Sequence, residues 1–180
     1  MPNRIHQLQQ LVKEANNLHI NSNWLAYSGI VEYHPEELVM TTKAGTKISE
    51  IQTELAKHNQ ALPFFVTPNT TIGATYAQGA QDLSDCILGV KIIDGTGDYL
   101  NFGGQVMKNV AGYDVSRLLV GSKGQFAIIT QISFKVMPST YIGKIERPCL
   151  SKNDQPIRQE IERRLKGVFD PRGIFNNVNN

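Results

Sequence analysis

Apolar positions along the chain follow helical spacing in some segments and strand spacing in others. Recurrence every three to four residues predicts helices over residues 4–17, 46–58 and 157–168. Alternation or short apolar runs predict strands over residues 30–33, 38–42, 87–93, 99–102 and 127–137. Asp114 is expected to cap a short helix over 115–120. Helices mixed with hairpin-forming strands indicate an α+β fold.

Three of these elements carry more specific expectations. Thr46 is a candidate N-cap of the second helix. Strict alternation in the last strand places Thr130, Ile132, Phe134 and Val136 on one face. In the C-terminal helix, the inward stripe is expected to consist of Ile157, Ile161, Leu165 and Val168.

Length and composition narrow the class of protein. The 180 residues fit one compact domain, and 18 basic against 16 acidic side chains disfavour a dedicated nucleic-acid binder. No apolar run reaches the roughly 20 residues that span a bilayer. Residues 1–17 lack the pattern of a secretory signal, so the cytoplasm is the expected compartment. Cys86 and Cys149 are isolated and are expected as reduced, partly buried thiols, with a disulfide between them left open.

The sequence gives little support for catalysis by side chains. The four histidines show no metal-ligand spacing, and Glu36, Glu37 and Glu50 are most simply solvated. We find no Ser-His-Asp arrangement, phosphate loop or Rossmann glycine triplet. No catalytic residue and no metal site is therefore assigned.

A glycine-rich block is the most informative feature, because its composition suits backbone that lies against a flat ligand. It reads Gly103-Gly104-Gln105-Val106-Met107-Lys108-Asn109-Val110-Ala111-Gly112-Tyr113-Asp114, and Gly121-Ser122-Lys123-Gly124 follows closely. The block resembles the FAD-binding subunits of glycolate oxidases, within the vanillyl-alcohol-oxidase superfamily of PCMH-type flavoproteins. A terminal Asp-Pro-Arg-Gly-Ile-Phe-Asn segment, residues 170–176, is similar to the same family.

The resemblance implies FAD as the cofactor and a set of contact residues. A turn along the pyrophosphate is matched by Thr71, Ile72, Gly73 and Ala74, in a segment that ends at Gly79. The adenine side is matched by the segment from Gly121 and Gly124 to Ile129. For Lys108 and Asn109, cofactor lining and a structural role are equally open. For Tyr113, Asp114 and Arg117 we favour capping, packing and surface pairing.

The resemblance also implies a domain plan. A two-lobed PCMH-type FAD-binding domain is expected over residues 1–138, with a small α/β lobe at about 1–62 and a larger, mostly antiparallel sheet with flanking helices at 63–138. Residues 139–156 stand as a linker where the family has a cap domain. Residues 157–180 are expected to return to the first domain as a helix and tail.

Departures from the family leave two hypotheses. Leu18 to Trp24 contains no glycine where the family has its pyrophosphate loop, and the stretch between Gly79 and Asp85 is short. The first hypothesis is an FAD-binding subunit that oxidises a small 2-hydroxy acid in a complex with a second flavoprotein and an iron–sulfur subunit. The second is a degenerate scaffold or interaction protein that has lost FAD.

Overall fold

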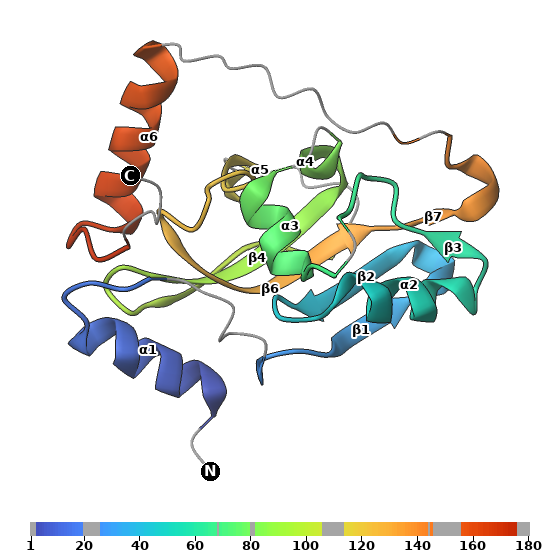
Figure 1. The fold of residues 1–180 in the computed structure, drawn as a ribbon, viewed down its shortest axis with the longest axis horizontal. Coiled ribbons are helices and arrows are strands. Elements are labelled where there is room, and N and C mark those ends of the chain that lie inside the picture. Colours follow the sequence, from blue (N-terminus) through green and yellow to red (C-terminus); the bar gives the residue numbers. More distant parts are fainter. Residues whose placement is uncertain are drawn as a thin grey trace.

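A five-stranded antiparallel sheet forms the centre of the computed structural model (Figure 1). The structure describes residues 3–19, 26–67, 69–79, 82–105, 114–143, 145 and 156–175, without side chains for 156–158. The strand order is β1-β2-β6-β4-β5. The bounds are β1 Ile30–His34, β2 Val39–Lys43, β4 Ile87–Asp94, β5 Tyr99–Gly103 and β6 Ala127–Lys135. A separate two-stranded pair joins β3 (Gln60–Ala61) to β7 (Met137–Pro138).

Helices flank this sheet. The α-helices are α1 Arg4–Glu14, α2 Ile48–Ala56, α3 Ile72–Gln78, α4 Leu83–Cys86, α5 Val115–Leu118 and α6 Pro156–Phe169. Two short 3₁₀ turns, η2 (Pro35–Glu37) and η3 (Ser139–Tyr141), follow β1 and β7. Strand β2 pairs directly with β6, so one sheet contains strands from both sides of the lobe boundary expected at residue 62.

Most elements lie where the hydrophobic pattern puts them, but the second helix begins differently from the prediction. Thr46 is not its N-cap: Lys47 occupies that position without a side-chain cap. The Thr46 hydroxyl instead donates to the Lys43 carbonyl at 2.7 Å and accepts from the Gly29 amide at 2.9 Å. It therefore fastens the turn before α2 to the chain that enters β1.

A bulge interrupts the alternation expected for the last strand. Lys91 of β4 lies opposite Gln131, whereas Ile92 lies opposite Ile129, so Thr130 is the extra residue. Its hydroxyl donates to the Lys91 carbonyl at 2.7 Å, and its own carbonyl accepts from the Ala44 amide at 2.8 Å. Strict alternation through Thr130 was thus wrong, because a bulge uses that residue to receive the loop after β2.

The sheet is covered on both faces. Ile92 and Ile132 belong to the main core with α2 and α3, whereas Ile93 and Ile128 pack in a second core with α1. Successive side chains of a strand point to opposite faces, so the two cores lie on opposite sides of the sheet. The second core also contains Ile174 and Phe175 at the C-terminal end.

Thr42 carries a buried hydroxyl in the main sheet that has no hydrogen-bond partner in the described structure. A buried polar group without a partner costs about 1–3 kcal/mol, whereas an apolar group of the same shape avoids that cost. Thr42→Val is therefore expected to raise the free energy of unfolding by about 1 kcal/mol, measured by urea denaturation. Thr41→Val is the matched control, because the Thr41 hydroxyl is bonded to Ser133 at 2.8 Å, and it should destabilise.

The C-terminal segment ties the second core together. The Asp170 side chain is fully buried and accepts hydrogen bonds from the amides of Ile174 (2.9 Å) and Phe175 (3.0 Å). Lys166 approaches the same carboxylate at 3.5 Å and donates to the Phe175 carbonyl at 2.6 Å. A side chain at Gly95, in the β4–β5 turn, would overlap Asp170. The end of α6 is thereby locked onto the hairpin.

Arg172 connects the same segment to α1. Its guanidinium donates to the carbonyls of Val12 (3.0 Å) and Ala15 (2.6 Å), where α1 ends. The Leu18 amide then donates to the Ile174 carbonyl at 2.7 Å. The family-like terminal segment, as far as Phe175, therefore holds the N-terminal helix against the sheet.

Helix α6 departs from its predicted inward stripe. Leu165 is half-buried and Phe169 is buried, but Ile161 is 48 % exposed and Val168 is 69 % exposed. The helix stands at one end of the molecule and meets the body mainly through its C-terminal turn (Figure 1). The apolar spacing correctly predicted a helix here. The expected burial of Ile161 and Val168 was wrong.

Candidate functional site

Two of the segments matched to the cofactor meet at the C-terminal end of α3. The Gly121 amide donates to the Tyr76 carbonyl at 2.9 Å, and the Lys123 amide donates to the Ala77 carbonyl at 2.8 Å. Gly79 and Gly121 both have positive φ, of 75° and 78°. A Cβ on Gly79 would lie 3.0 Å from the Gly121 Cα, so the two glycines allow the backbones to touch.

The first turn of α3 holds Thr71, Ile72, Gly73 and Ala74, and its amides are engaged within the chain. Thr71 is the N-cap, with its hydroxyl accepting from the Ala74 amide at 3.2 Å. The Ile72 amide donates to Thr46 (3.0 Å), that of Gly73 to Ala44 (2.9 Å) and that of Thr75 to Thr71 (3.0 Å), in each case to the carbonyl. None of these four amides is left to donate to a phosphate.

Gly73 packs against the chain so closely that it makes a poor probe of ligand contact. A Cβ there would lie 2.8 Å from both the Cβ and the carbonyl oxygen of Ala44. We expect Gly73→Ala to lower the free energy of unfolding by roughly 1–3 kcal/mol, as overpacking does. Gly73→Val adds a larger side chain at the same place and should disturb the fold more than Gly73→Ala does.

A chemical denaturation series tests this expectation. Gly167→Ala is the control, because Gly167 lies in α6 with no atom within 4 Å of its missing Cβ. That substitution should stabilise by roughly 0.5–1 kcal/mol through helix propensity. Equal effects at the two glycines would contradict the packing at Ala44.

The loop after β2 connects the first turn of α3 with strand β6. Ala44 accepts from Gly73 and donates to the Thr130 carbonyl, which places α3 beside the bulge in β6. Ile129 is half-buried and packs against the main core, and Gly124 has a φ of 75° in the turn before β6. Sequence reasoning did not assign Ala44, Thr46 or Thr130 to the site. Their backbone contacts join segments that lie far apart in the sequence, so no local pattern reveals them.

The described edges of the glycine-rich block have structural roles. Gly103 has a φ of 73°, and a Cβ on it would overlap the Leu88 carbonyl oxygen. Gln105 then reaches across the sheet, where its side-chain amide donates to Thr41 (3.1 Å) and to the Glu32 carboxylate. Gly103 thus allows close contact between two chain segments. Lys108, Asn109 and Tyr113 lie outside the described residues.

Asp114 and Arg117 have the structural roles expected of them. The Asp114 carboxylate accepts from the Arg117 amide at 3.2 Å and so caps α5. The Arg117 guanidinium pairs with Asp114 at 3.0 Å and approaches Asp85 at 3.8 Å. Both side chains are partly exposed, so these pairs contribute little to stability.

Burial keeps two ionisable groups of this region, Tyr76 and Cys86, protonated at neutral pH. Burial raises the pKa of Tyr76 well above its ordinary range, and its hydroxyl donates to the Ser116 carbonyl at 2.5 Å. Burial raises the pKa of the free Cys86 thiol to about 11. Cys149 lies outside the described residues. Within the described ranges, no group of three His, Cys, Asp or Glu side chains is placed to hold a metal.

Parts of the sequence are similar to a protein family model and to known proteins. Residues 22–103 match the model of the FAD binding domain family. The glycolate oxidase subunit GlcE of Escherichia coli is 43% identical over 123 residues, which cover 62% of this chain and 35% of that protein. The glycolate oxidase subunit GlcD of Bacillus subtilis is 28% identical over 123 residues, or 61% of this chain and 25% of that protein.

Solved structures agree on the fold. An alkyldihydroxyacetonephosphate synthase superposes with a TM-score of 0.61 at 17% identity, covering 74% of this chain and 30% of that one. This likeness confirms the expected α+β class with a mostly antiparallel sheet. In the described part of the chain, no helix is long and apolar enough to cross a membrane.

The chain spans about a third of GlcE and a quarter of GlcD, so the likeness concerns part of each relative. Over that part, the sequence match, the family model and the fold agree with one another. By sequence, part of this chain is similar to the glycolate oxidase subunits GlcE and GlcD, and its fold is similar to that of the alkyldihydroxyacetonephosphate synthase.

Proposed function

We propose that this chain takes part in the flavin-dependent oxidation of a small 2-hydroxy acid, as a glycolate-oxidase-like subunit of a multi-subunit complex. The observation that carries the proposal is the 43% identity to the glycolate oxidase subunit GlcE, which is supported by the FAD binding domain match over residues 22–103. When bound, FAD supplies the acceptor for the hydride or electrons, and the protein orients it. No side chain of this chain is assigned to the chemistry.

In this proposal FAD lies against the backbone surface around α3 and the turn before β6. The contact residues are those matched from the sequence: Thr71, Ile72, Gly73, Ala74, Gly79, Gly121, Gly124 and Ile129, with Lys108 and Asn109. The close contact between the backbones of Gly79 and Gly121 supports this placement, because it brings two of the matched segments together. Partner chains that resemble GlcD and an iron–sulfur subunit would carry the electrons onward. The complex would reside in the cytoplasm, with any membrane association through those partners.

The residues assigned to FAD from the sequence do not fit one part of it, its pyrophosphate. Amides in the first turn of α3 are bonded within the chain, and the Leu18 to Trp24 segment has no glycine for an anion-binding turn. This observation favours a second candidate function, a scaffold or interaction protein that has lost FAD. The backbone contact between Gly79 and Gly121 is consistent with both candidates, whereas the occupied amides favour the second.

An absorbance spectrum of the protein purified from its native source separates the two candidates. Bands near roughly 370 and 450 nm would support the flavin-bound subunit. Co-purification of partner chains, identified by mass spectrometry, tests the complex separately. A protein without flavin that still co-purifies with glycolate-oxidase-like chains would support the scaffold. Absence of both would sink the proposal.

A further inference from the structure

A row of amine and amide side chains crosses the face of the sheet that α1 covers in part. Lys43 of β2 lies opposite Gln131 of β6, which lies opposite Lys91 of β4. Asn101 of β5 continues the row beside Lys91. Their neighbours Thr42, Ile132 and Val90 are buried on the opposite face, so the row shares one face, and Lys43, Gln131 and Lys91 are half-buried.

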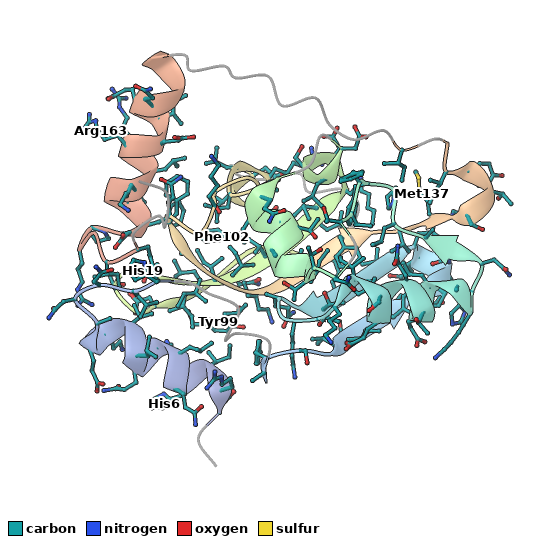
Figure 2. The ribbon with its side chains drawn as sticks, viewed as in Figure 1. His6, His19, Tyr99, Phe102, Met137 and Arg163 are labelled. Carbon is teal, nitrogen blue, oxygen red and sulfur yellow. The ribbon has the colours of Figure 1, made fainter. Side chains whose placement is uncertain are left out.

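Other groups border this row on two sides. The Lys43 amine lies 5.0 Å from the centre of the Tyr27 ring. Figure 2 shows Tyr99 between the β4–β5 hairpin and α1. On the other side of the row, Gln105 crosses the sheet to its hydrogen bond with Thr41. We call the row with Tyr27 and Tyr99 the amine strip.

In the described part of the chain, neither lysine of the amine strip has an acidic partner. No Asp or Glu of the described ranges lies within ion-pair distance of the Lys43 or Lys91 amine. Residues 20–25 and 106–113, next in sequence to the described stretches that border the strip, contain no Asp or Glu. Glu32, the nearest carboxylate in register, accepts from Gln105. A half-buried ammonium without a counter-charge is a natural partner for an anion.

The geometry limits which anion fits. Two strand spacings separate the Lys43 and Lys91 backbones by roughly 10 Å, and flexible four-carbon stems let both ammonium groups converge above Gln131. Two converging charges with an amide donor between them suit an extended, multiply charged group. Aromatic rings at the border suit a base or other flat ring. A diphosphate-bearing nucleotide meets both requirements.

We propose that the amine strip binds the diphosphate of a nucleotide through Lys43 and Lys91. The identification of that nucleotide as FAD rests on the proposed function. Lys43 adjoins Ala44, which bonds to both Gly73 and Thr130, so the strip meets the backbone surface assigned to FAD at the end of β2, on the face of the sheet opposite α3. Its side chains would then replace the amide contacts that α3 does not provide.

Calorimetric titration of the purified full chain with inorganic pyrophosphate, ADP and FAD at low salt tests the proposal. We expect pyrophosphate and ADP to bind, and Lys43→Gln and Lys91→Gln each to weaken them by about tenfold, the loss of one charge-assisted bond. Lys57→Gln is the control, because Lys57 is exposed on α2 and pairs with Glu54 at 2.6 Å. It should leave binding unchanged.

The possible results distinguish failure of the amine-strip proposal from failure of the proposed function. Pyrophosphate binding that depends on both lysines, without FAD binding, supports the strip and overturns the flavin role. FAD binding that is insensitive to both substitutions, with no pyrophosphate binding, overturns the strip and leaves the flavin role standing. Thermal melts of each variant confirm folding, since Gln keeps much of the lysine stem. Equal loss in Lys57→Gln would also overturn the strip.

Discussion

Isolated protein is expected to bind FAD with a dissociation constant in the micromolar range or weaker, and to oxidise no glycolate without partner chains. The segment from Leu18 to Trp24 lacks glycine, and the amides of Ile72 to Thr75 are bonded within the chain. Each charge-assisted hydrogen bond lost from a pyrophosphate is worth roughly 1.5–3 kcal/mol. The loss of two such bonds weakens binding by on the order of a hundredfold or more.

Titration of apo-protein with FAD, followed by quenching of flavin fluorescence, measures the dissociation constant. The same titration in the presence of glycolate-oxidase-like partner chains is the control. Tighter binding there would mean that the partners complete the phosphate contacts. A nanomolar constant for the isolated chain would contradict the expectation and would show that other contacts, such as those of the amine strip, hold the phosphates as tightly as the missing amides would.

Asp170→Ala is expected to lower the free energy of unfolding by roughly 3–5 kcal/mol, a large share of the stability of a domain this size. The carboxylate is buried, and its removal leaves the amides of Ile174 and Phe175 without acceptors and Lys166 without its counter-charge. Asp170→Asn keeps one acceptor oxygen and should cost less. The second core, which contains Ile174 and Phe175, would be disrupted first.

Guanidinium denaturation of both variants provides the stability, and hydrogen exchange of α1 localises the effect. Asp85→Ala is the control, because its side chain is 82% exposed and its contact with Arg117 is 3.8 Å. Such a surface pair contributes at most about 1 kcal/mol. An Asp170→Ala protein as stable as the control would show that the buried network does not hold α1 in place.

Local patterns determined most of the elements. Apolar spacing located α1, α2 and α6. A short apolar run followed by turn residues located the β4–β5 hairpin. These features depend on near neighbours in the chain, through helix periodicity, strand alternation and turn chemistry. Capping by Thr71 and Asp114 was also readable, since an N-cap bonds an amide only two or three residues away.

Contacts between distant segments decided the rest, because no local pattern encodes which surfaces meet. The glycines suggested a ligand surface, yet Gly73 faces Ala44, Gly79 faces Gly121 and Gly103 faces Leu88. Glycine permits any close approach, so its presence identifies tight contact but not the partner. Likewise the row of Lys43, Gln131 and Lys91, whose lysines pair with no described Asp or Glu, exists only because strand register brings these residues together. Tertiary structure therefore determined which backbone amides and side-chain charges remain free for a ligand.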